Sequence, residues 1–251
     1  AGPAVINNEV LLEVQQALID YNNSGMSILS ISHRSDLFME IVHDAHNLLR
    51  ELLNIPDNYE VAFISGGASE QFSDIPKNLS NMDDTADYAL TGHWSRVAFK
   101  YANKFINAKG VEVDQRAVCE QGFSINPAAS YLYLTNNETV DGIEFNDISK
   151  IYANAKSVGV PIVADMSSNI LSRPIDISQY GVIFACAQKN IGPSGLSIVI
   201  VRSDLLDRAR FNTEKTRHYK SIIAKESVLN TPNTFAIYMA SRVFAWVKRN
   251  G

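Results

Sequence analysis

The alternation of short apolar runs with longer amphipathic stretches is the feature that most constrains the fold of this 251-residue chain. Apolar runs of this length predict strands, and stretches with helical spacing predict helices. The predicted strands are 61–64, 88–91, 131–134, 161–164, 182–187 and 197–201. The predicted helices are 7–22, 35–54, 69–80, 94–107, 147–157, 203–209 and 233–249. This alternation indicates an α/β fold with a mostly parallel central sheet.

Several predicted strands are apolar throughout, and the run from Val182 to Ala187 is the clearest case. Such strands are typical of a sheet that helices cover on both faces. The chain contains no internal repeat, low-complexity tract or evident linker. We therefore expect residues 1–251 to form a single domain.

Composition and charge exclude several classes of function. The chain is 46% hydrophobic and 20% charged, with a formal net charge of -5, as in ordinary globular proteins. Its Lys and Arg residues form no basic cluster, so no nucleic-acid partner is expected. No apolar run approaches the roughly 20 residues of a membrane span, and no signal segment is visible. Two cysteines are too few for a disulfide framework, and we expect a cytoplasmic protein.

Two polar residues stand at the ends of predicted strands, where the sites of such sheets form. Lys189 lies between an apolar strand and a Gly-Pro turn. Partial desolvation there would lower its pKa and permit a Schiff base, although a surface lysine in a tight turn also fits. Asp165 ends another strand. Its carboxylate could keep a pyridine nitrogen protonated, or it could cap the following turn.

Three further segments follow predicted strands. Residues 65–69 read Ser-Gly-Gly-Ala-Ser, and a glycine turn before a helix suits a phosphate, although many such turns bind nothing. The segment matches neither a dinucleotide fingerprint nor a nucleoside-triphosphate loop. Trp94 could stack on a planar cofactor or pack in the core. The hydroxyls and amides of the polar loop 135–142 could form a hydrogen bond to a phenolic oxygen, or the loop could simply form turns.

Taken together, these segments resemble the phosphoserine aminotransferases, which are fold-type-I pyridoxal-phosphate enzymes. The matching segments run in order along the whole chain. They are 1–4, 32–35, 66–69, 71–72, 92–95, 137–139, 141–142, 164–168, 170–174, 187–195 and 230–232. The most specific strings are Ile-Leu-Ser-Arg-Pro at 170–174 and Ala-Gln-Lys-Asn-Ile-Gly-Pro-Ser-Gly at 187–195.

The resemblance implies a pyridoxal 5'-phosphate cofactor and a role for each matching residue. Lys189 would bind the cofactor covalently and move a proton, and Asp165 would pair with the pyridine nitrogen. Trp94 would stack on the ring, and Thr139 would bond to the phenolic oxygen. The residues implied for the cofactor phosphate are Ala68, Ser69 and Gln188, with Asn230 and Thr231 from the neighbouring subunit of a homodimer.

The resemblance also implies the reaction. His33 and Arg34 resemble the family's contacts to the substrate anion. The implied reaction exchanges an amino group between phosphoserine and 2-oxoglutarate, a step of serine biosynthesis. A desulfurase or a serine–glyoxylate type aminotransferase would share the fold, but the His33-Arg34 pair argues against both. A nucleotide-binding α/β protein is the remaining alternative.

Two features depart from the family pattern. The chain stops at Gly251, before the family's small C-terminal domain and its carboxylate-binding arginine, so we expect weakened turnover. The helix after Ser69 carries Glu70, Asp74 and Lys77 on one face, and unpaired charges there would penalise a dimer contact. The alternative is therefore a trimmed or engineered monomeric large-domain scaffold with weak or no transaminase activity.

Overall fold

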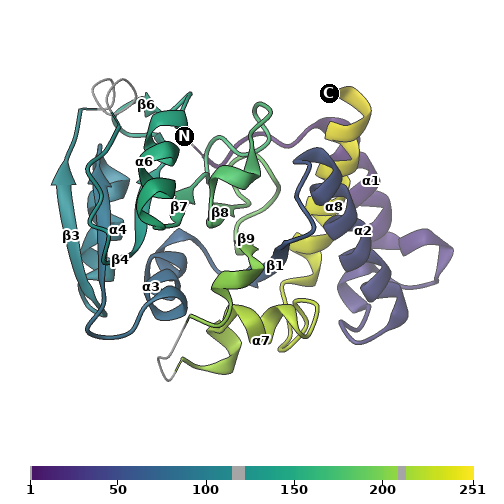
Figure 1. The fold of residues 1–251 in the computed structure, drawn as a ribbon. Helices are drawn as coiled ribbons and strands as arrows, with labels where there is room; N and C mark the ends of the chain where they lie inside the picture. Colours follow the sequence, from purple (N-terminus) through teal and green to yellow (C-terminus); the bar gives the residue numbers. More distant parts are fainter. Residues whose placement is uncertain (1, 115–121, 209–212) are drawn as a thin grey trace.

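The computed structural model describes residues 2–114, 122–208 and 213–251. Its centre is a seven-stranded sheet (Figure 1) with the strand order β1-β9-β8-β7-β4-β2-β3. The strands are β1 (Tyr59–Ser65), β2 (Thr85–Leu90), β3 (Asn107–Glu112), β4 (Ala129–Thr135), β7 (Ile162–Asp165), β8 (Val182–Cys186) and β9 (Leu196–Arg202). A two-stranded hairpin of β5 (Asn137–Glu138) and β6 (Ile143–Glu144) follows β4.

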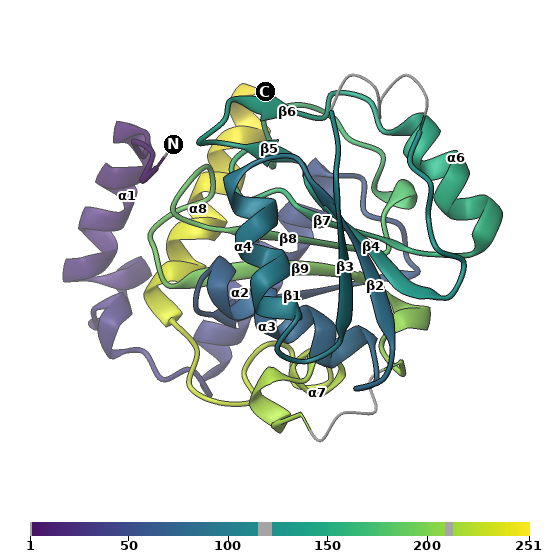
Figure 2. The same ribbon diagram turned by 90° about the vertical axis from the view of Figure 1, so that its left-hand side faces the viewer.

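Helices cover both faces of the sheet. They are α1 (Asn8–Ile19), α2 (Asp36–Leu52), α3 (Ala68–Leu79), α4 (His93–Ala102), α6 (Ser149–Val158), α7 (Tyr219–Ile223) and α8 (Thr234–Asn250). Figure 2 shows α3 and α4 in front of the sheet, whereas α1, α2 and α8 lie together on the other side. Alternate strand residues belong to the two cores: Phe63 packs with α1, α2 and α8, and Ile64 with α3 and α4. This period of two is that of a strand covered on both faces.

The pairing of the strands sets where the chemistry can lie. β3, β2, β4, β7 and β8 are joined by parallel pairings. β9 runs antiparallel to both β8 and β1. Consequently β1 runs in the same direction as β8, and the carboxyl ends of β1, β2, β4, β7 and β8 meet at one edge. The predicted fold, with a mostly parallel sheet between helices, is confirmed.

Two local predictions were wrong. The predicted helix 94–107 ends at Ala102, and residues 107–112 form the edge strand β3, which no apolar run marks because it is mostly exposed. Edge strands of this kind carry polar and charged residues, as Lys109 and Glu112 do here. The predicted helix 203–209 is reduced to one 3-10 turn, Ser203–Leu205.

The charged residues on one face of α3 are largely paired within the chain. Asp74 is 3% exposed and lies 3.4 Å from Arg217. The Lys77 ammonium lies 4.6 Å from the centre of the Phe105 ring, within range of a cation–π contact. Two of the three charges are therefore satisfied inside the chain, and they give no argument against a dimer.

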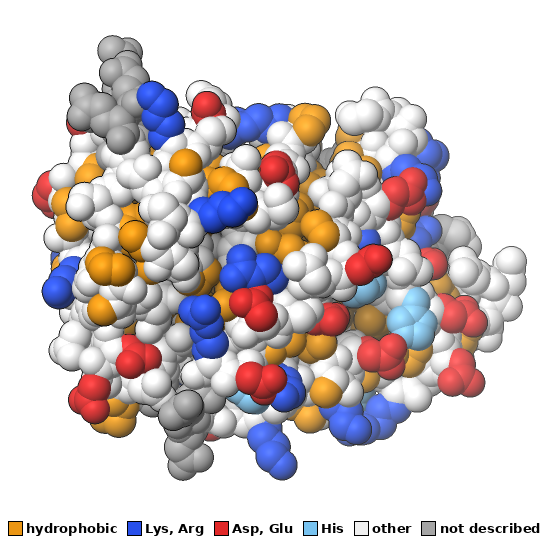
Figure 3. Space-filling model, in the orientation of Figure 1, with side chains coloured by type: hydrophobic (Ala, Val, Ile, Leu, Met, Phe, Trp, Pro, Cys, Tyr) orange, Lys and Arg blue, Asp and Glu red, His pale blue; other side chains and the backbone are white. Residues whose placement is uncertain are grey.

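The surface and the helices give two further observations. On the face shown in Figure 3, Lys and Arg side chains are interspersed with Asp and Glu and form no continuous basic area. Within the described residues, no helix combines the length and the apolar character that a membrane crossing requires. Cys119 lies outside the described residues, and Cys186 is a buried free thiol.

Candidate active site

A pocket of about 400 Å³ opens where the carboxyl ends of the strands meet. Its lining comes from the ends of β4, β7 and β8 and from the segments that follow β1, β2 and β8. The lining residues are Ala68, Trp94, Thr135, Asn137, Thr139, Asp165, Ser167, Ser168, Cys186, Gln188 and Lys189. This edge is where open parallel sheets bind their ligands.

The pocket brings together six of the residues predicted from sequence: Ala68, Trp94, Thr139, Asp165, Gln188 and Lys189. The other predicted residues lie outside its lining. Ser69 lines a shallow depression beside Arg217, and Asn230 lines a separate pocket near Ser65. Thr231 and Arg34 are exposed, and His33 is half-buried with Nε2 left without a hydrogen-bond partner.

Asp165 is the buried acid of the pocket. It ends β7, is 7% exposed, and accepts a hydrogen bond at 2.9 Å from the Ser167 backbone amide. Its pKa is raised to about 6, chiefly by burial and also by the carboxylate of Glu138, whereas Ser167 and Lys189 act to lower the pKa. An ionised carboxylate in this position lacks a compensating cation at contact distance, so it favours a ligand that brings one.

Lys189 lies in the tight connection between β8 and β9. The backbone there is fixed, because the amides of Ile191 and Gly192 donate to the Ala187 carbonyl at 3.0 and 2.7 Å. The Gln188 carbonyl accepts from the Ala4 amide at 2.9 Å, which holds the N-terminal segment beside the pocket. A Cβ added at Gly2 would lie 2.5 Å from Lys189 Cδ. The lysine side chain is therefore packed along its stem on a rigid turn.

The helix α3 begins at Ala68, which lines the pocket. Its Gly67 amide donates to Glu70 Oε2 at 2.8 Å, whereas the amides of Ala68 and Ser69 have no partner among the described residues. Gly66 has a φ of +123°, a conformation open to glycine and strained for other residues. The start of α3 is therefore suited to an anion, through its amides and the helix dipole.

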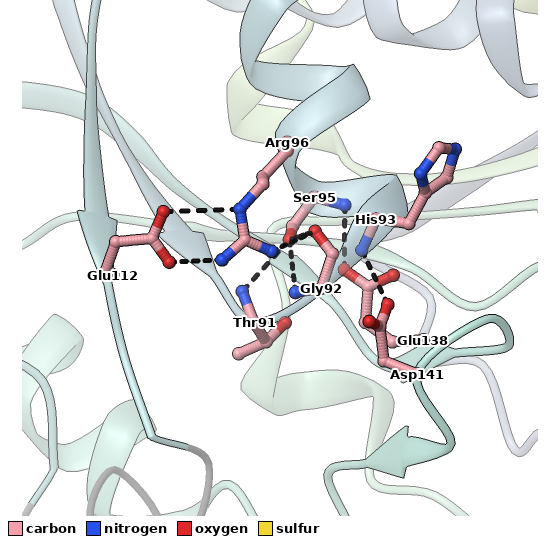
Figure 4. A network of polar contacts seen from close by, with 8 residues as sticks. All are labelled: Thr91, Gly92, His93, Ser95, Arg96, Glu112, Glu138 and Asp141. Carbon is pink, nitrogen blue, oxygen red and sulfur yellow. Dashed lines mark hydrogen bonds and ion pairs between the residues drawn. The ribbon is translucent and has the colours of Figure 1, made fainter.

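The helix α4 differs, because its first amides are already occupied (Figure 4). The Trp94 and Ser95 amides each donate to Glu138 at 2.8 Å, and the His93 amide donates to Asp141 at 2.7 Å. Figure 4 draws the Ser95 and His93 contacts. The Trp94 indole Nε1 donates to Thr139 Oγ1 at 3.1 Å. Of the two helix starts beside the pocket, α3 is therefore the one left open to a phosphate.

Sequence reasoning gave no individual role to Thr135, Ser167 or Cys186, although the polar loop 135–142 that it considered for a phenolic oxygen begins at Thr135. Thr135 lies opposite Asp165 in the register of β4 and β7, and its Oγ1 is buried without a hydrogen-bond partner. Burial raises the pKa of the Cys186 thiol to about 11, so this thiol stays protonated and is a poor nucleophile. Each of these residues sits at a strand end, but only the sheet order places them beside one another.

Comparisons with known proteins agree with this geometry. The model of the class-V aminotransferases matches residues 1–251. The phosphoserine aminotransferase of Laribacter hongkongensis is 48% identical and that of Chromobacterium violaceum 44% identical, each over 256 residues that cover 100% of this chain and 69% of the relative.

Solved structures give the same result. A phosphoserine aminotransferase from Bacillus circulans subsp. alkalophilus has a TM-score of 0.90 at 37% identity, covering 99% of this chain and 69% of that one. A PLP-bound phosphoserine aminotransferase from Trichomonas vaginalis has a TM-score of 0.90 at 37% identity, covering 100% and 74%. The chain therefore belongs to the class-V aminotransferase family. Within that family it is similar to the phosphoserine aminotransferases, and the resemblance noted from sequence is confirmed.

Proposed function

We propose that this chain is a pyridoxal-phosphate-dependent aminotransferase that moves an amino group between phosphoserine and 2-oxoglutarate. Residues 1–251 would form its cofactor-binding domain. The observation that carries the proposal is that Asp165 and Lys189 line one pocket with Trp94. Asp165 ends β7, and Lys189 follows the adjacent strand β8. An amine, a buried acid and an aromatic face are the groups that a substituted pyridine aldehyde requires.

The residues of the pocket fit this cofactor in three ways. The buried, unpartnered Oγ1 of Thr135 offers a hydrogen bond that the protein itself does not satisfy. The free amides at the start of α3 suit a phosphate. The raised pKa of Asp165 is relieved when a cation lies beside it. Each feature is unfavourable or unused among the protein's own contacts, so each supports binding of this group.

Each residue of the pocket would have its own role in the reaction. When bound, pyridoxal phosphate supplies an electron sink for negative charge that develops on the substrate carbon. Asp165 would hold the proton on the ring nitrogen through its negative charge. Lys189 would take a proton from the substrate carbon and return it, as a general base and acid whose stem is fixed on a rigid turn. Trp94 would exclude water from one face of the ring, and Thr139 would orient the phenolic oxygen.

A homodimer would explain the predicted residues that lie outside the pocket. Asn230, Thr231 and Arg34 are exposed in this chain, and their side-chain chemistry suits a phosphate or another anion. We propose that these residues, together with His33, reach the pocket of a neighbouring subunit. Closed two-fold symmetry would then give each dimer two equivalent pockets.

Subunit complementation tests this arrangement. Lys189→Ala and Arg34→Ala proteins would each be inactive alone, and mixing them after subunit exchange should restore about a quarter of the wild-type activity. That fraction arises because half of the dimers are mixed and each of them has one intact pocket. A mixture that stays inactive, or a monomer in light scattering, would contradict the shared pocket.

Visible absorbance of the chain with pyridoxal phosphate tests the function itself. We expect a band that Lys189→Ala abolishes, that the control Lys225→Ala retains, and that phosphoserine shifts. Lys225 is exposed and lies outside the pocket lining. A band that persists in Lys189→Ala would overturn the assignment. A Lys189-dependent band that ignores phosphoserine would favour the alternative, a domain that holds the cofactor without transamination.

A further inference from the structure

We propose that Glu138 is a positioning residue of this site: its buried carboxylate fixes the first turn of α4 and thereby the place of the Trp94 indole. The inference rests on the proposed cofactor site, since Trp94 would form one wall of it. Glu138 is fully buried, with 0% of its surface exposed. A buried carboxylate without a cationic partner is costly unless both oxygens are satisfied, and here two backbone amides satisfy them.

The contacts form a cap that is supplied from outside the helix (Figure 4). Glu138 Oε1 accepts from the Ser95 amide and Asp141 accepts from the His93 amide, and Figure 4 shows both contacts. Glu138 Oε2 accepts from the Trp94 amide. The first three amides of α4 are thus bonded to carboxylates of the hairpin segment that follows β4. Negative charge at a helix start is stabilised by the helix dipole and by hydrogen bonds to charged acceptors.

The residue before α4 makes this outside cap possible. Gly92 occupies the cap position of α4 and has no side chain to contribute. A Cβ there would lie 2.4 Å from Asp141 Oδ2 and 2.7 Å from Glu138 Cδ. The glycine therefore leaves the space that the two carboxylates fill, and the helix start depends on them.

The same hairpin segment reaches the pocket from two sides. Thr139, the residue after Glu138, accepts a hydrogen bond from the Trp94 indole at 3.1 Å. Asn137, the residue before it, donates to Ser168 Oγ at 3.0 Å, and Ser168 Oγ donates to the Asn137 carbonyl at 3.2 Å. Three consecutive residues thus hold the Trp94 wall and the wall that follows Asp165 at a fixed separation.

The chemistry of the contact requires a carboxylate. Two N–H donors need two acceptor oxygens, and an amide side chain offers one oxygen and one NH2 group. In Glu138→Gln, a donor would face the Trp94 or the Ser95 amide, leaving a buried group unsatisfied. The first turn of α4 would shift away from it and carry the indole of Trp94 along.

The first test uses the chain without cofactor. The sequence contains two tryptophans, so Trp246→Phe leaves Trp94 as the only indole. In that background Glu138→Gln should lose the near-ultraviolet circular dichroism of Trp94 and make its fluorescence more accessible to acrylamide. Glu112→Gln is the matched control, because Glu112 bonds to Arg96 on the same helix and to none of its amides, and it should change neither signal.

The second test measures affinity for pyridoxal phosphate. Glu138→Gln should weaken binding about tenfold, the equivalent of one lost hydrogen bond to a charged group. At pH 8, where Asp165 is ionised with or without the charge of Glu138, the same substitution in a Trp94→Ala background should have no effect, because Glu138 acts through the indole. A purely structural role would weaken binding equally in both backgrounds, and that result would overturn the proposal.

Two results separate this inference from the proposed function. If the unmodified chain binds no pyridoxal phosphate, the proposed function fails, while the Trp94 signals of the cofactor-free chain still test the positioning. If Glu138→Gln does not fold, Asp141→Ala is the milder variant, since it removes only the acceptor of the His93 amide, and a smaller change of the same Trp94 signals is expected. Unchanged Trp94 signals in a folded Glu138→Gln protein, or in Asp141→Ala where Glu138→Gln does not fold, would overturn the inference.

Discussion

The carboxylate of Asp74 in α3 lies 3.4 Å from the guanidinium of Arg217, with only 4% of the Asp74 side chain exposed. Burial raises the pKa of Asp74 to about 6, and Arg217 compensates this only in part. A carboxyl group whose pKa is higher in the folded state binds its proton more tightly there. Ionisation between about pH 4 and pH 6 therefore destabilises the fold.

Asp74→Asn should remove this pH dependence. A pKa change from 3.8 to about 6 corresponds to about 3 kcal/mol, so the variant should gain up to that much relative to wild type between pH 4 and pH 8. Urea unfolding at several pH values measures it. The exposed Asp83→Asn serves as the control, and a difference between Asp74→Asn and wild type that stays constant with pH would contradict the argument.

Asp165 should make cofactor binding depend on pH. Below about pH 6 the Asp165 carboxyl is protonated and cannot pair with a protonated ring nitrogen. The affinity for pyridoxal phosphate should therefore decrease as the pH is lowered. Asp165→Asn should bind about tenfold more weakly at pH 8. The ratio of the dissociation constants of the Asp165→Asn and wild-type proteins should approach one near pH 5. Fluorescence titration at both pH values checks this, and a ratio that does not change with pH would refute it.

Two glycines offer a matched pair of substitutions. Gly92→Ala would place a methyl group 2.4 Å from Asp141 Oδ2 and displace the carboxylates that cap α4, which should cost at least about 2 kcal/mol. Gly142→Ala meets no atom but has a φ of +69°, so it should cost about 1 kcal/mol. Chemical denaturation ranks the two, and equal effects would mean that the space at Gly92 is not required.

A pair of buried hydroxyl groups gives a third stability test. The hydroxyls of Tyr88 and Tyr131 lie 2.6 Å apart, and both side chains are at most 1% exposed. Tyr88→Phe alone leaves the other hydroxyl unsatisfied, at about 1–3 kcal/mol. The double Tyr88→Phe, Tyr131→Phe variant should lose less than the sum of the two single changes. Additive losses in denaturant titrations would show that the pair is not coupled.

The sequence predicted those elements whose pattern is local. The 35–54 prediction matches α2 because Ser35 caps the helix through the Phe38 amide and an apolar face repeats along it. The strand β3 escaped prediction because an exposed edge needs no apolar run. Local pattern therefore identifies buried elements better than edges.

The residues of the site likewise differ in whether the local sequence predicts them. Lys189 and Asp165 were predictable because each follows an apolar strand. The hydrogen bond that the Trp94 amide donates to Glu138 joins residues 44 positions apart, and no local sequence pattern predicts it. Asn230 and His33 lie outside the pocket lining of this chain, and no local pattern in the sequence indicates that.

The sheet order has a consequence for the order in which the chain can fold. Among the described strands, β1 is flanked by β9 alone, and Ile64 pairs with Ser197. The strand that leads into the turn before α3 therefore cannot pair until a much later segment of the chain has been made. The helix α2 likewise packs on α8, the last helix. Closing loops of this length is slow, because their entropy must be lost before the contacts form. On the ribosome, the start of α3 would therefore acquire its final shape after Asp165 and Lys189 have been synthesised. The turn before α3 is therefore completed late in folding, and apolar β1 needs protection until then.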